Sequence, residues 1–173
     1  CGHLFKRSLV LIKAWCRHEG SRYGAGLAIL SSRTGHLSTH ALNVMVLAIF
    51  IDLEKEGPFM DLDPLSVLTR FLQVYARFRW QACWVNVVKT VEDGEPDERC
   101  GLEAVVGRLC ACLRERLAVV PNSRRAPSTF EVRSCNVVDP FTPTNNLGLC
   151  VSAAGLIHIT RAFSDGWAHL QSL

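Results

Sequence analysis

The chain has 173 residues, enough for one domain with a real core; 49% are hydrophobic, and the mean hydropathy is +0.16. The net charge is +3, and residues 1–40 hold six Lys or Arg against one acid, Glu19. This basic first third indicates a phosphate-bearing partner or, alternatively, a solvated helix face. The longest apolar run, 41–51, is too short to span a bilayer, so we expect no membrane segment.

Eight cysteines are scattered along the chain without a C-x-x-C pair or the spacing of a small secreted domain. We therefore expect reduced, mostly buried thiols in an intracellular protein of the nucleus or cytoplasm. The chain begins at Cys1 rather than Met and enters helical periodicity at once. This start leads us to expect a fragment of a longer protein.

Apolar periodicity close to 3.6 predicts helices at 3–19, 37–53, 64–80, 102–119 and 152–170. The helix at 37–53 is apolar nearly all round, so we expect it in the centre of the core. Asp63 before Pro64 is typical of an N-cap followed by proline at the first helical position.

The segments between these helices predict two strands and several connections. Strands are expected at 83–88 and 132–138, and loops at 20–35 (with a short helical piece at 27–30), about 90–99 (acidic) and about 121–128 (a polar linker). We therefore expect one mainly α domain over 1–173, a helical bundle of about five helices with two or three short β-strands.

The stretch 137–148 contains two prolines, two adjacent asparagines and a glycine. The prolines fix φ and bias the preceding residues toward extended conformations, so we predict a stiff turn. The amides of Asn145 and Asn146 each offer donors and an acceptor, which is the chemistry needed to read a nucleobase edge. An isolated pattern of this kind also fits an ordinary proline-rich connection whose asparagines cap a turn.

Taken together, residues 139–163 resemble the nucleotide-recognition loop of terminal nucleotidyltransferases, the poly(A)- and poly(U)-adding members of the polymerase-β superfamily. The likeness rests on Asp139-Pro140, on Asn145-Asn146-Leu147-Gly148 and on the later Arg161-Ala162-Phe163. Residues 4–17 and 36–51 resemble the second, PAP/OAS-like substrate-binding domain of the same family, with plant and algal members nearest.

The resemblance implies nucleotide-binding roles for eight residues: Lys13, Arg17, Ser38, Thr39, His40, Asp139, Asn145 and Asn146. Lys13 and Arg17, one helical turn apart, would meet the triphosphate. Thr39, or Ser38, would supply a hydroxyl contact, and the ring of His40 would stack on the base. His40 stands where the family usually has Tyr; imidazole can still stack, but it also titrates near neutral pH.

The two asparagines are expected to differ in role. At the position of Asn145, uridylyl-adding members tend to carry His, whereas a smaller amide leaves room for a purine and matches adenine's donor and acceptor. The resemblance therefore favours ATP over UTP. Asn146 is expected to hold the turn.

The family's catalytic carboxylates lie on a separate palm domain, as an Asp-x-Asp pair after a Gly-Ser. Gly20-Ser21 is followed at that place by Ser32-Arg33-Thr34, and residues 1–51 contain no Asp. Asp61-Leu62-Asp63 is better explained by helix capping. We expect no catalytic residue in this chain, and the resemblance implies Mg²⁺ or Mn²⁺ bound by the palm.

His36 and His40 have an H-x-x-x-H spacing that could bind zinc on a helix. No glutamate lies between them and no third ligand is evident, so the sequence does not favour a metal site in this chain.

The sequence thus predicts the nucleotide- and RNA-positioning domain of an RNA 3′-terminal nucleotidyltransferase, inactive by itself. The implied partners are a nucleoside triphosphate, the RNA 3′ end and the palm domain. The alternative is a non-catalytic nucleic-acid-binding or scaffold module of a protein whose palm is missing or degenerate.

Overall fold

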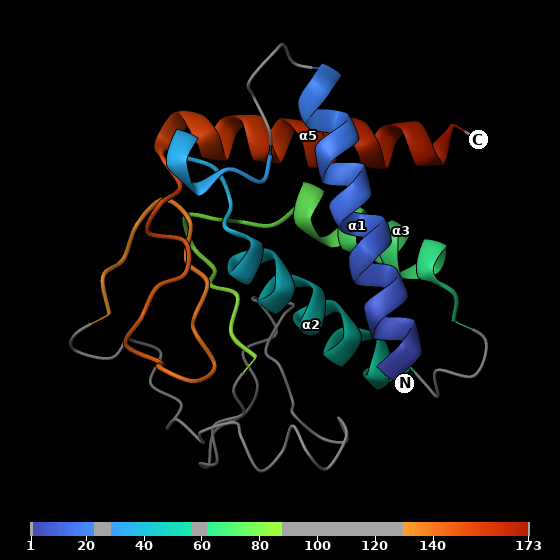
Figure 1. Ribbon diagram of the computed structural model, residues 1–173, viewed down its shortest axis with the longest axis horizontal. Coiled ribbons are helices and arrows are strands. Elements are labelled where there is room, and N and C mark those ends of the chain that lie inside the picture. Colours follow the sequence, from blue (N-terminus) through green and yellow to red (C-terminus); the bar gives the residue numbers. More distant parts are fainter. Residues whose placement is uncertain (1, 23–28, 57–61, 88–129, 173) are drawn as a thin grey trace.

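A computed structural model describes four stretches of the chain, residues 2–22, 29–56, 62–87 and 130–172. They form four α-helices and one 3₁₀ turn (Figure 1): α1 (Gly2–Arg22), η1 (Ser32–Thr34), α2 (Thr39–Glu56), α3 (Pro64–Ala76) and α5 (Ala153–Gln171). This confirms a mainly helical fold. The predicted helix at 102–119, the acidic loop and the linker lie outside the described residues. No helix of the described stretches is both long and apolar enough to cross a membrane.

Helix α2 lies at the centre of the core, as its apolar sequence predicts. Its side chains without exposed surface are Ala41, Leu42, Met45, Val46 and Ile49. The hydroxyl of Tyr75 on α3 donates to the Met45 carbonyl at 2.9 Å, which ties α3 to α2 through a buried hydrogen bond. Helix α3 also packs along α5 and against α1, so that α2 and α3 together form the interior of the bundle (Figure 1).

The helix starts follow local capping chemistry. The carboxylate of Asp63 accepts the Ser66 amide at 2.7 Å, and Pro64 occupies the first turn of α3, as the sequence predicts. The hydroxyl of Ser152 accepts the Gly155 amide at 2.9 Å and caps α5 in the same way.

Helix α3 ends at Ala76, four residues before the predicted end at Trp80. After Ala76 the chain turns, so that Phe78 and Trp80 pack edge to face with ring centroids 4.7 Å apart. Trp80 also stacks on the buried Tyr75 at 5.8 Å. This aromatic packing is a tertiary contact, and it outweighs the local helical pattern.

The strands predicted at 83–88 and 132–138 are not formed as strands. They reduce to isolated bridges, Val85 with Val137 and Val138 with Asn146. In the first bridge the Val85 amide donates to the Asn136 carbonyl, and the Val138 amide donates to the Val85 carbonyl, both at 2.9 Å. The Val137 amide faces the other way and donates to Asn146 Oδ1 at 3.1 Å. The 3₁₀ turn at Ser32–Thr34 likewise lies beyond the helical piece predicted at 27–30, of which Ile29 and Leu30 are described and are not helical.

The cysteines that the structure describes are free thiols, as predicted. Cys16, Cys83 and Cys135 are buried, and Cys150 is half-buried. Burial raises the pKa of Cys16 and of Cys135 to about 12. These two thiols therefore act as small core side chains at neutral pH.

The start of α5 docks against the segment that leads into α2. Gly35 adopts a positive φ of 77°, and its carbonyl accepts the Ser152 amide at 2.9 Å. A β-carbon at Gly155 would lie 1.9 Å from the Gly35 carbonyl oxygen. This close backbone approach holds residues far apart in sequence, 35 and 155, side by side next to the beginning of α2.

Replacing Gly155 by Ala should therefore destabilise the protein. We expect a net loss of about 1–3 kcal/mol in the free energy of unfolding, because the methyl group meets backbone rather than a movable side chain. Gly166→Ala is the comparison on the same helix, since its β-carbon would meet a side chain, the half-buried Trp15 ring at 2.6 Å, and we expect a smaller loss from it than from the backbone clash. Denaturant unfolding followed by circular dichroism measures both, and a Gly155→Ala protein as stable as the wild type would contradict the docking.

Candidate functional site

Two segments distant in sequence meet at the beginning of α2. There the side chain of His40, in the first turn of the helix, approaches the loop that begins at Asp139. His40 Nε2 lies 4.0 Å from Asp139 Oδ1, and Asn145 Nδ2 donates to Asp139 Oδ2 at 2.9 Å. The structure thus brings together three of the residues predicted from the sequence, and we call them the α2 cluster.

Hydrogen bonds of Asp139 hold the two ends of the turn 139–145 together. Its other oxygen accepts the Phe141 amide at 2.9 Å, and its own amide donates to the Asn145 carbonyl at 3.1 Å. Asp139 is only 8% exposed, whereas Asn145 is exposed and the His40 side chain is half exposed. The buried carboxylate of Asp139 therefore orients the exposed amide of Asn145 and lies beside the half-exposed ring of His40.

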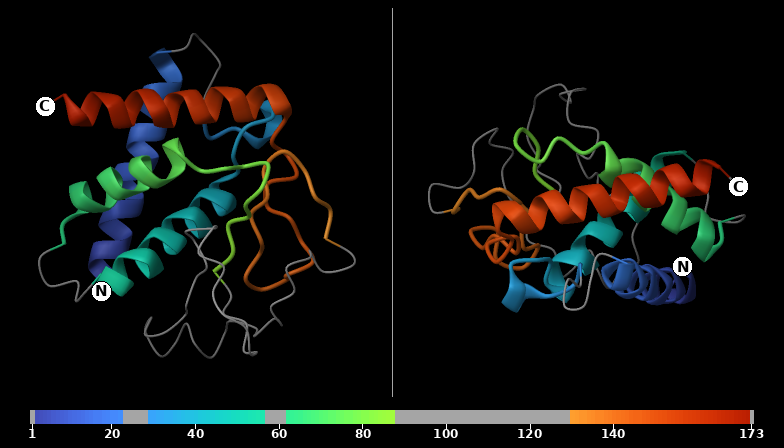
Figure 2. Two further views of the ribbon diagram at one scale, coloured as in Figure 1. Left: turned by 180° about the vertical axis from the view of Figure 1, so that it is seen from behind. Right: turned by 90° about the horizontal axis from the view of Figure 1, so that it is seen from above.

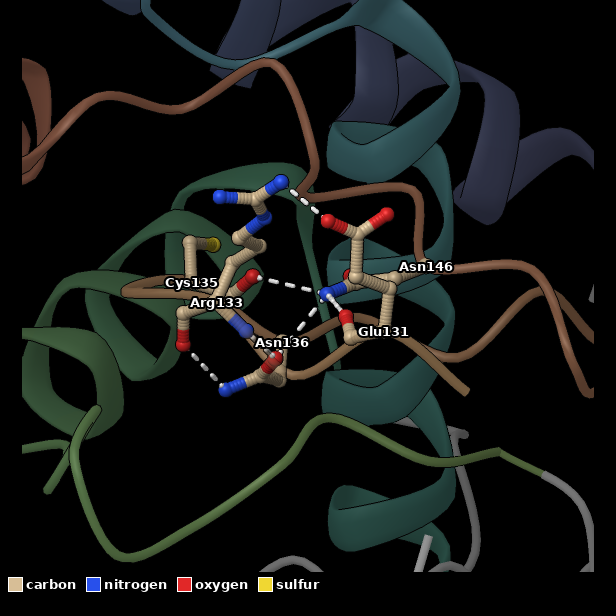
Figure 3. Close-up of polar contacts among 5 residues, drawn as sticks. All are labelled: Glu131, Arg133, Cys135, Asn136 and Asn146. Atoms are coloured by element: carbon tan, nitrogen blue, oxygen red, sulfur yellow. Dashed lines mark hydrogen bonds and ion pairs between the residues drawn. The ribbon is translucent and has the colours of Figure 1, made fainter. Parts of the chain in front are cut away.

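Asn146 occupies the interior of the same loop, with 2% of its surface exposed. Its amide nitrogen lies within hydrogen-bonding distance of the Glu131 and Cys135 carbonyls and of Asn136 Oδ1, at 2.9, 3.2 and 2.9 Å (Figure 3). Its oxygen accepts the Val137 and Gly148 amides at 3.1 and 2.9 Å.

These contacts use the donors and the acceptor of Asn146 within the loop, which supports the turn-holding role expected for it. Asn136 extends the network, because its amide exchanges hydrogen bonds with both backbone groups of Arg133 at 2.8 and 2.7 Å. Gly148 completes it, since a β-carbon there would lie 2.3 Å from the Cys135 carbonyl oxygen. The loop therefore has a rigid base from which Asn145 projects.

The two hydroxyl candidates occupy different positions. Ser38 accepts the Ala41 amide at 3.0 Å and so caps α2. Thr39 is exposed and makes no side-chain hydrogen bond with the described residues. The first turn of α2 also carries the partial positive charge of a helix N-terminus, which favours an anion.

Lys13 and Arg17 lie on α1, outside the α2 cluster. Lys13 is half-buried and Arg17 exposed. Within the described part of the chain, no hydrogen bond or ion pair joins either cation to the α2 cluster. The two cations therefore form a separate part of the candidate site, on α1.

The loop also exposes an aromatic residue that was not singled out from the sequence. Phe141 is 58% exposed, and its amide is bound to the carboxylate of Asp139. A bulky apolar side chain between two loop prolines was the available signal. Its side chain adds exposed apolar surface to the same loop.

The structure does not combine His36 and His40 into a helical metal site. His36 precedes α2, is 3% exposed and stacks on His158 of α5 with ring centroids 5.8 Å apart. Burial, together with the neighbouring His158, lowers the pKa of His36, so that it stays neutral at physiological pH. Among the residues that the structure describes, no three His, Cys, Asp or Glu side chains gather to hold a metal ion.

These features define a helical domain that presents a rigid polar loop and an exposed ring at a helix N-terminus. The family model of the PAP/OAS1 substrate-binding domain matches residues 1–173, and the chain belongs to this family. Membership indicates a role in nucleotide or RNA binding of the nucleotidyltransferase type. Comparisons with curated proteins and with solved structures gave no match.

The adjacent asparagines offer a direct test of the loop. Asn146→Ala leaves several buried polar groups without partners, so we expect it to lower the free energy of unfolding by about 2–4 kcal/mol. Asn145→Ala removes one exposed amide and should cost less than about 1 kcal/mol. Urea unfolding measures both, and equal losses would mean that the loop does not depend on the buried amide.

Proposed function

We propose that this domain binds a nucleoside triphosphate, favours ATP over UTP, and positions the nucleotide for addition to an RNA 3′ end. The α2 cluster carries the proposal, because a buried carboxylate holds an exposed amide next to a half-exposed imidazole. Such a pre-oriented amide loses little freedom on binding a base, which is how a rigid site gains selectivity.

The base would be recognised by Asn145. One of its N–H groups donates to Asp139, which leaves the second N–H and the amide oxygen for a ligand. Adenine offers an adjacent donor and acceptor that match such an amide. The ring of His40, next to Asp139, would cover one face of the base, and the exposed Phe141 on the same loop is a candidate for the other face.

The phosphates would be met by cations and by the helix terminus. Lys13 and Arg17 share one face of α1, and the first turn of α2 adds its N–H groups and the free hydroxyl of Thr39. This arrangement neutralises charge and positions the ligand.

The described residues do not fit a Mg²⁺ or Mn²⁺ site, because they contain no cluster of carboxylates. In the proposal the metal belongs to the palm domain, and this domain contributes no general acid, general base or metal ligand. A full-length protein without a competent palm would instead use the same surface for non-catalytic nucleotide or RNA binding.

The phosphate contacts predict a loss of affinity without a loss of fold. In the full-length protein, Lys13→Ala and Arg17→Ala should each weaken ATP binding about ten- to a hundredfold, the value of one charge-assisted contact. Isothermal titration gives the affinity and circular dichroism the melting temperature, with Lys6→Ala on the same helix as the control. Variants that melt early but bind ATP normally would show that the pair is structural.

The base contact predicts a change of selectivity. The wild-type full-length enzyme should add mainly A to RNA when all four ribonucleotides compete. Asn145→His should gain U, because the larger ring narrows the pocket toward a pyrimidine. Sequencing the extended 3′ ends measures the preference. A wild-type preference for U or C would refute the assignment, and ATP binding without any extension would favour the non-catalytic alternative.

A further inference from the structure

A groove of about 630 Å³ lies between the turn that follows α3 and the N-terminal half of α5. Figure 2, seen from above, shows segment 77–87 on one side of α5, with η1 and α1 on the other side. The groove shares no residue with the α2 cluster or with the cations of α1. Its volume falls within the range of about 300–1,000 Å³ that is usual for binding clefts.

The charged residues that line the groove are positive. Arg79 from the turn and Arg161 from α5 line it, and its lining contains no acidic residue. Arg161 Nε lies 3.8 Å from Asp165 Oδ2 on the same helix, in an exposed pair, and adds its positive charge to that of Arg79. Gln81 and Thr160, also in the lining, add neutral hydrogen-bonding groups between the two guanidinium groups.

The rest of the lining is apolar. Ile157 is 68% exposed, and Leu156 and Ala82 continue the apolar surface. Trp80 also lines the groove; it is 5% exposed, and its indole N–H has no hydrogen-bond partner among the described residues. The groove therefore combines positive charge, an aliphatic contact surface and an unpaired buried donor.

We propose that this groove docks a short segment of a partner protein that carries an aliphatic side chain flanked by carboxylates. The exposed guanidinium group of Arg79 can bind a carboxylate through two parallel hydrogen bonds, and the positive charge of Arg161 attracts a second acidic residue. The aliphatic side chain would pack on Ile157 between them. Hydrogen-bond acceptors of the peptide, such as its carboxylates and carbonyl groups, would suit the N–H and O–H donors that line the groove.

The same charge could attract RNA, but the lining does not favour it. Proteins that bind single-stranded RNA commonly stack bases on exposed aromatic rings. The aromatic residue of this groove, Trp80, is buried against Tyr75 and Phe78 and offers no face for stacking. An aliphatic contact surface between two arginines suits a peptide better than a base.

The test uses the full-length protein and fluorescently labelled short peptides with a central leucine between acidic residues. Peptides in which amides replace the acids are the matched control, and a labelled single-stranded RNA oligonucleotide is the second arm. We expect saturable binding of the acidic peptides in the order of tens of micromolar by fluorescence anisotropy, and much weaker binding of the amide peptides.

Substitutions of the lining residues test whether the peptide binds in the groove. Arg79→Glu and Arg161→Glu should each reduce the affinity for the acidic peptide at least about tenfold, and Ile157→Ser should also reduce it. All three residues are exposed, so the fold should survive. Lys6→Glu, an equal charge change on α1, should leave peptide binding unchanged.

The proposal is overturned if the acidic peptides show no saturable binding up to about 1 mM, or if the amide peptides bind as well. It also fails if the charge reversals weaken binding of the RNA oligonucleotide and not of the peptide. That result would assign the groove to RNA.

Discussion

The buried amide of Asn146 is the interaction on which the candidate site depends. Its oxygen accepts the Val137 and Gly148 amides and its nitrogen contacts the Cys135 carbonyl, so one side chain joins segment 135–137 to the turn at 146–148. A closed network of buried hydrogen bonds is rigid and costly to break. The neighbouring Asn145 can therefore remain exposed and still keep a defined direction, set by the carboxylate of Asp139.

A second constraint brings this loop to the beginning of α2. The backbone of Gly35 is joined to the cap of α5 through the Ser152 amide, and Gly155 allows the two chains to touch. The segment from Gly35 to His40 is thus held against the N-terminus of α5, directly after the loop that carries Asp139. Selectivity in the proposed site then follows from two fixed backbones rather than from the strength of any one side-chain contact.

Much of the fold follows from the sequence, because helices are signalled locally. Apolar periodicity and the cap at Asp63 placed the described helices within a few residues. The end of α3 was predicted wrongly, because Trp80 in the turn packs on Tyr75 in the helix. Periodicity in the sequence does not encode such a tertiary contact. The predicted strands are present only as isolated bridges, Val85 with Val137 and Val138 with Asn146.

The residues of the candidate site could also be predicted from the sequence, whereas their contacts could not. Family resemblance selected His40, Asp139 and Asn145, and the structure brings these three together. Their contacts could not be read from spacing, since about one hundred residues separate His40 from Asp139. The arginine-lined groove had no sequence signal, because Arg79 and Arg161 come from separate elements. Helix α5 links both surfaces, through Ser152 at its cap and Arg161 on its exposed side. Its buried Ile159 and Phe163 anchor it in the core. A ligand at either surface therefore binds to a helix whose position is already fixed.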